Sequence, residues 1–171
     1  MQGEGNNFKS YIYSRWFVGS IATSWKLTKN PTLARIAAER AGRRVFNEIF
    51  GAGKKWTLKS WVEVAKKDIH EALGTNVNFA EGEDQVLMYV QECPFRDVMK
   101  LDRYATCSFH YGTWRSAFRK AFPDGELLLG ESLLPEVISK GASECKFKFL
   151  LNASDEDRML AMKQRRDLFI D

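Results

Sequence analysis

The chain has 171 residues, of which 44% are hydrophobic and 28% are charged. These values fit an ordinary globular protein, and a core of that size needs no disulfide staple. The formal net charge is +4, with a balance of +7 on residues 1–72 and −3 on residues 73–171. The cations never form a run of five, so we interpret them as solvated helix faces and expect no nucleic-acid partner.

The sequence carries no targeting or membrane signal. Its N-terminus reads "MQGEGNNFK", which is polar and glycine-rich, and no run approaches the roughly 18 apolar residues that a membrane helix needs. The three cysteines have no C-x-x-C spacing and are expected to be reduced. We therefore expect a cytoplasmic protein with no contact to the membrane.

Residues 1–75 predict three helices. The first covers residues 8–28, the second runs from the capping residue Asn30 to about Phe50, and the third begins near Thr57 and ends at Gly74. His70 falls off the apolar stripe of the third helix, so we expect it to be solvated and assign it no role. The first helix carries too many large rings for a free surface, so it should pack on the sheet, roof a pocket or form a homodimer. Those rings are Trp16, Phe17 and Trp25.

The rest of the chain predicts a sheet. Residues 76–94 form a hairpin with a glycine-containing turn at 80–84, residues 104–122 a helix, residues 125–134 and 144–151 two strands, and residues from Ser154 a helix with an Asp157 capping box. The fold class is therefore α+β, an antiparallel sheet of about four strands with N-terminal helices packed on one face. We expect a single domain over residues 1–171, with a helical part at 1–75, a sheet-bearing part at 76–152 and a C-terminal helix at 153–171.

All three cysteines lie at the ends of predicted elements. Cys93 ends a strand, Cys107 lies near the start of a helix, and Cys145 begins the last strand. Three interpretations remain open: buried packing, a thiolate at Cys107 with His110 as its base, and a zinc site. The zinc site would combine the thiolates with His110, Glu131 or Glu136. Either kind of site requires the sulfurs of Cys107 and Cys145 to lie within roughly 8 Å of each other.

Short motifs resemble two related families. "ECPF" at 92–95, Cys107 and "GASECKFKF" at 141–149 resemble the C-terminal pattern of the L-2-amino-thiazoline-4-carboxylic acid hydrolase family. "CSFHYG" at 107–112 together with "GASECKF" also resembles the 4-vinyl-reductase domains.

The hydrolase resemblance implies the opening of a C–N bond in a small cyclic amidine. Cys107 would be the nucleophile or a metal ligand, His110 the base and Tyr111 a donor to the developing charge. This chain departs from the family pattern, because His110 and Tyr111 stand where an acidic residue usually follows the central cysteine. The substrate would contact Cys93, Cys145, Glu131 and Trp114.

The 4-vinyl-reductase resemblance implies a different class of protein, a sensor that binds a hydrophobic or tetrapyrrole-like ligand without turnover. Some of these domains hold zinc through Cys and Glu, a pattern that falls here on Cys107, Glu136 and Cys145. Ser139 stands where a further cysteine would be expected. A third interpretation is a basic interaction protein that works through residues 1–72.

Overall fold

The computed structural model describes residues 23, 26, 30–45, 50, 54–71, 75–93, 95, 99 and 103–168. Within these residues it contains helices and one four-stranded antiparallel sheet, which confirms the predicted α+β class. Apart from Thr23 and Lys26, the predicted helix over 8–28, with its aromatic rings and its proposed dimer contact, lies outside the described residues. No described helix combines the length and the apolar character needed to cross a membrane.

Helix α2 (Pro31–Val45) begins with the cap predicted from the sequence, and helix α3 (Leu58–Val64) begins with a cap that the sequence analysis did not predict. Helix α2 begins after Asn30, whose Oδ1 accepts the Leu33 N–H at 3.1 Å. Helix α3 begins after Thr57, which exchanges two hydrogen bonds with Ser60. Each cap satisfies an amide that the helix itself leaves unpaired.

The prediction for His70 is wrong. After Val64 the chain continues as a π-helical segment, η1 (Ala65–Glu71), whose wider turns shift later residues away from a 3.6-residue stripe. His70 is consequently buried, with 5% of its surface exposed. Its ring stacks on Trp114 at a centroid distance of 5.0 Å, and its Nδ1 lies 2.7 Å from Thr75 Oγ1.

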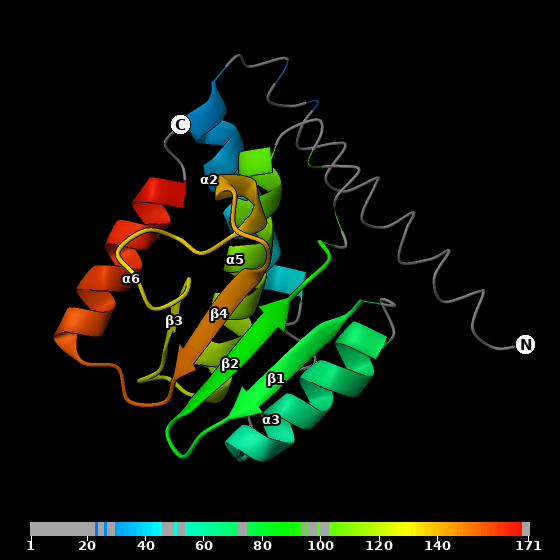
Figure 1. Cartoon of the computed structure of the whole chain (residues 1–171), viewed down its shortest axis with the longest axis vertical. Helices are drawn as coiled ribbons and strands as arrows, with labels where there is room; N and C mark the ends of the chain where they lie inside the picture. Colours follow the sequence, from blue (N-terminus) through cyan, green and yellow to red (C-terminus); the bar gives the residue numbers. More distant parts are fainter. Residues whose placement is uncertain are drawn as a thin grey trace, which may run out of the picture.

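The sheet contains β1 (Val77–Glu81), β2 (Gln85–Val90), β3 (Glu126–Leu128) and β4 (Cys145–Leu150) in the order β1-β2-β4-β3 (Figure 1). Every neighbouring pair is antiparallel. The predicted hairpin is confirmed, because β1 pairs with β2 across a short turn at residues 82–84. β4 lies in the middle of the sheet, although it is the last strand in the sequence.

The predicted strand over 125–134 is wrong beyond Leu128. The side chain of Gln164 hydrogen-bonds both backbone groups of Leu129. Its Oε1 accepts the Leu129 N–H at 2.8 Å, and its Nε2 donates to the Leu129 carbonyl at 3.3 Å. The next residue, Gly130, has φ 88°, a left-handed conformation that ends an extended strand. The chain therefore leaves the sheet, and the buried Leu129 lies against α6 (Asp155–Leu168). The predicted capping box of α6 between Ser154 and Asp157 is confirmed.

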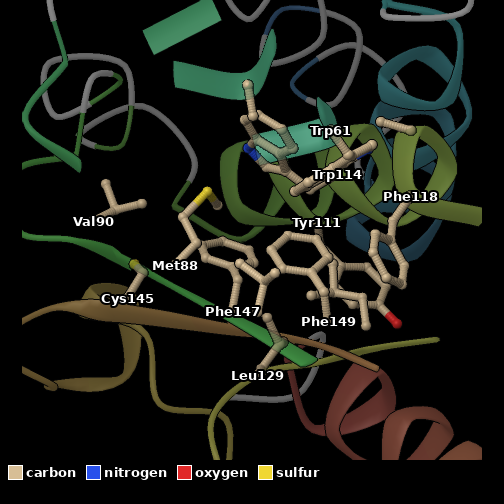
Figure 2. Close-up of a cluster of buried hydrophobic side chains, with 14 of the residues drawn as sticks. Trp61, Met88, Val90, Tyr111, Trp114, Phe118, Leu129, Cys145, Phe147 and Phe149 are labelled. Atoms are coloured by element: carbon tan, nitrogen blue, oxygen red, sulfur yellow. The ribbon is translucent and has the colours of Figure 1, made fainter. Parts of the chain in front are cut away.

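One face of the sheet carries the main core. Alternate residues of β2 and β4 point to this face, where α3 and α5 (Arg103–Ala121) cover them (Figures 1 and 2). Trp61 from α3 is fully buried and lies 5.8 Å from Trp114 and 4.9 Å from Phe149, measured between ring centroids. The buried residues of the two strands are Val86, Met88, Val90, Cys145, Phe147 and Phe149.

Helix α5 also packs closely against α2 through two glycines. A Cβ at Gly112 would lie 2.5 Å from the Glu39 carbonyl oxygen, and one at Gly42 would clash with the Phe109 carbonyl. The absence of a side chain at Gly112 therefore lets the backbone of α2 approach α5. The close approach holds the buried Glu39 against α5.

Replacing Gly112 with Ala should destabilise the protein despite the better helix propensity of alanine. Propensity alone would favour alanine by about 1 kcal/mol, whereas overpacking against a rigid backbone costs about 1–3 kcal/mol. We expect the free energy of unfolding, measured by urea denaturation, to fall by about 1–2 kcal/mol. The exposed Glu63→Ala substitution on α3 is the control and should change it by less than about 0.5 kcal/mol. A more stable Gly112→Ala variant would show that the helices are not in backbone contact.

Candidate functional site

The three cysteines line one cavity. All three are described, none is disulfide-bonded, and the cavity they share has a volume of about 20 Å³. It lies between the N-terminal half of α5 and the end of the sheet where β2 finishes and β4 begins. Besides the cysteines, its wall consists of Phe95, Met99, Thr106, His110, Tyr111, Leu129, Val137, Ile138, Ser139, Phe147 and Leu168.

The strand register explains why distant cysteines meet. Val90, the last residue of β2, pairs with Cys145, the first residue of β4. Cys93 follows Val90 by three residues, and Cys107 comes from the helix that crosses this end of the sheet. The expectation that cysteines at element ends converge on one site agrees with this arrangement.

The thiols of Cys93 and Cys145, at the end of the sheet where β2 finishes and β4 begins, are in their protonated form at neutral pH. Desolvation by burial raises the pKa of Cys145 to about 12, although its Sγ accepts the Ile138 N–H at 3.3 Å. Desolvation likewise raises the pKa of Cys93 above its usual value. A thiol that stays protonated is a weak nucleophile and a weak metal ligand.

His110 is a neutral imidazole held between aromatic rings. Its Nε2 accepts a hydrogen bond from Trp114 Nε1 at 2.8 Å, and its ring meets those of Phe95 and Phe147 edge to face. Although the residue keeps some exposed surface, these apolar neighbours desolvate the ring, and with the nearby His70 they lower its pKa to about 3. The hydrogen bond occupies Nε2 and leaves the proton on Nδ1.

The neutral state of His110 argues against the predicted low-pKa thiolate at Cys107. Such a thiolate would need His110 as a cation, which its surroundings disfavour. Cys107 is also not in the first turn, since α5 begins at Arg103 and the effect of the helix dipole falls off within one turn. The third catalytic candidate, Tyr111, lines the cavity, and burial raises the pKa of its hydroxyl above the usual range, so it is a proton donor at neutral pH.

The predicted acidic residues point elsewhere. Glu131 is exposed and lies 3.3 Å from Lys148 Nζ. Glu136 pairs with Lys146 at 2.8 Å and accepts the Glu131 N–H at 2.9 Å. Trp114 contributes its ring to the core and its N–H to His110 rather than a surface to the cavity.

The predicted zinc set is therefore wrong. Within the described part of the chain, no three His, Cys, Asp or Glu side chains are grouped so that they could share a metal ion. The reason is the partner of Glu136: its carboxylate is held by Lys146 on the neighbouring strand and by a backbone amide, so it does not join Cys107 and Cys145.

Ser139 is the site residue that sequence reasoning did not identify. It lies on the short 3-10 helix η2 (Ile138–Lys140), lines the cavity and is 7% exposed. Its hydroxyl is buried and has no hydrogen-bond partner among the described residues. A buried polar atom without a partner is costly and marks a place where another molecule can bind. The sequence signal was its position, where the family resemblance expects a cysteine.

No protein-family model and no curated protein matches this sequence. The resemblance to the hydrolase and 4-vinyl-reductase families consequently remains a prediction from short motifs, and the site is interpreted from its own geometry.

Burial of neutral imidazoles should make the stability depend on pH. The pKa of His70 is lowered by desolvation from 6.5 to about 4, so the unfolded chain binds more protons than the folded one between these values. The stabilisation of the folded state that depends on neutral His70 is complete above pH 6.5 and is lost as the pH falls towards 4. At pH 5, where carboxylates stay ionised, His70 alone should reduce the free energy of unfolding by about 2 kcal/mol relative to pH 7.5. Urea denaturation at both pH values should show that the free energy of unfolding falls less in the His70→Gln variant than in the wild-type protein. Equal drops in the two proteins would refute the assignment.

Proposed function

We propose that this chain is a ligand-binding domain whose cavity takes a small apolar molecule with one hydrogen-bonding group. The observation that carries the proposal is the unpaired Ser139 hydroxyl in an otherwise largely apolar wall. A cavity with apolar sides and a few polar groups is the usual form of a small-molecule site. The ligand would place its polar atom on Ser139 and its apolar part against Phe147 and Leu129.

The protonation states of the wall favour binding over turnover. Covalent catalysis needs an activated nucleophile and a base that can take its proton. Here the pKa values of Cys93 and Cys145 are raised and that of His110 is lowered, so all three groups are uncharged at neutral pH. An uncharged, desolvated wall suits an apolar ligand because no buried charge has to be compensated.

The size of the cavity adds a condition. A volume of about 20 Å³ has room for about one water molecule, so a ring-sized ligand requires side chains to move. Met99 is suited to this, because an unbranched side chain with three rotatable bonds adapts to irregular shapes. We therefore expect binding to be accompanied by repacking of the wall near Phe95 and Met99.

A second candidate is the hydrolase of a small cyclic amidine. The observation in its favour is that Cys107 and His110, one helical turn apart on α5, line the same cavity together with Tyr111. In this mechanism the Cys107 sulfur bonds to the amidine carbon, the C–N bond breaks with a proton delivered to the nitrogen, and water then releases the product. Because Nδ1 carries the imidazole proton, this mechanism requires His110 to accept a proton at Nε2, which must first give up the hydrogen bond from Trp114.

The cysteines offer a direct test, since every cysteine of the chain lines this cavity. We expect iodoacetamide to label all three more slowly at pH 7.5 than the thiol of a denatured sample, because Cys145 is buried, Cys93 is half-buried and both thiols stay protonated. Saturating indole, an apolar ring with one N–H donor, should slow labelling further at all three, as followed by mass spectrometry of each peptide. Fast labelling of Cys107 alone that His110→Ala abolishes would favour the hydrolase instead. Labelling that indole does not affect would count against the cavity as its site.

Ser139→Ala separates a ligand-binding hydroxyl from a structural one. Removing an unpaired buried hydroxyl should leave the free energy of unfolding unchanged or raise it by up to about 1 kcal/mol, while weakening the protection by indole. The matched control is Ser108→Ala on α5, whose equally buried hydroxyl donates to the Tyr104 carbonyl at 2.6 Å. That substitution should cost about 1 kcal/mol. An equal loss in the free energy of unfolding in the two variants would mean that the Ser139 hydroxyl is already paired.

A further inference from the structure

A second pocket lies beside the C-terminal parts of α2 and α5. Its volume is about 320 Å³, and among the described residues it shares no wall with the thiol-lined cavity. Four of its side chains are cations, one from α2 and three from α5. The wall consists of Arg43, Arg115, Ser116, Arg119, Lys120 and Pro123.

Two of the arginines are held in place by buried carboxylates. Arg115 donates from Nε and Nη2 to both oxygens of Glu126, each at 2.6 Å, and Glu126 is 2% exposed. Arg43 pairs through Nη2 with the buried Glu39. A guanidinium has five N–H donors, so each arginine keeps donors for a further acceptor after making its ion pair. Their positions are therefore fixed before any ligand arrives.

The remaining two cations make no ion pair with the described residues, although the charge of Arg119 helps to lower the pKa of Glu126. Arg119 and Lys120 are exposed, and no carboxylate of the described residues lies within ion-pair distance of either. Glu39 also accepts a hydrogen bond from Arg165 at 2.7 Å, so its single charge is shared between two guanidinium groups.

The helix dipoles do not account for this charge. Each helix C-terminus carries a charge of about −0.5, which favours nearby cations. Four cations against two carboxylates leave two positive charges, about twice what the two helix ends offset. The pocket is therefore electropositive, with fixed donors at its base and adaptable ones at its rim.

From this arrangement we propose that the pocket binds the phosphate group of a small phosphorylated molecule. Phosphate matches the planar donor sets of arginine, and a lysine adds a compact charge. A volume of about 320 Å³ lies at the small end of ligand pockets, which favours a compact phosphate monoester over an extended nucleic-acid strand. The Ser116 hydroxyl, which donates to the Arg43 carbonyl at 3.0 Å, links the two helices at the pocket wall.

The test is a titration of the full chain, followed by amide chemical shifts, with ribose 5-phosphate and with inorganic phosphate. We expect saturable shifts at Arg43 and residues 115–120 with both probes, and tighter binding of the ester if a phosphorylated molecule rather than free phosphate is the ligand. The double substitution Arg119→Gln with Lys120→Gln should weaken binding at least about tenfold, since it removes two charge-assisted donors.

The control is Lys163→Gln with Arg166→Gln, which removes the same charge from exposed positions on α6. It should change the affinity by less than about twofold, because neither residue lines the pocket and interactions between exposed charges are weakened by screening at physiological salt. Equal weakening by both pairs, or shifts spread over the surface, would overturn the proposal as general attraction of anions. Absence of saturable shifts in the wild-type protein would overturn it outright. Binding of a short single-stranded oligonucleotide without binding of ribose 5-phosphate would overturn it in favour of nucleic acid.

Discussion

The contact of Trp61 with the rings around it is the constraint on which the rest of the structure depends. This one side chain lies within 6 Å, between ring centroids, of Phe50, Trp114, Phe118 and Phe149, and so joins α3, α5 and the sheet. Burying large rings stabilises the core and fixes the position of α5 across the strands (Figure 2). Because α5 is fixed in this way, four of its residues line the cavity beside Cys93 and Cys145.

The same packing sets the chemistry of the cavity. Trp114 stacks on His70 and donates its N–H to His110, so one ring of the core orients both imidazoles. The aromatic surroundings keep the imidazoles neutral, and burial keeps the thiols of Cys93 and Cys145 protonated. The imidazoles and these two thiols are therefore uncharged at neutral pH, although the spacing of Cys107 and His110 resembles a catalytic pair in sequence.

Much of the fold could be predicted from local patterns, whereas the site could be predicted only in part. The predicted caps at Asn30 and Ser154 were correct because each depends on residues within one turn of the chain. The misplaced strand after Leu128 and the misplaced His70 have non-local causes. The strand ends early because Gln164, 35 residues away in the sequence, hydrogen-bonds the backbone of Leu129. His70 is buried because a π-helical segment changes the direction in which the later side chains of that helix point.

The sequence by itself determined the α+β class, the hairpin and the placement of the three cysteines at element ends, because period and turn chemistry are local properties. Only the tertiary structure decided that these cysteines share a cavity and that Glu136 is paired with Lys146 rather than facing them. It also decided that the Ser139 hydroxyl in the cavity wall has no hydrogen-bond partner among the described residues. Burial, desolvation and the competition for partners depend on contacts between distant residues. Those contacts are set by how the helices pack on the sheet, which no stretch of the chain specifies alone.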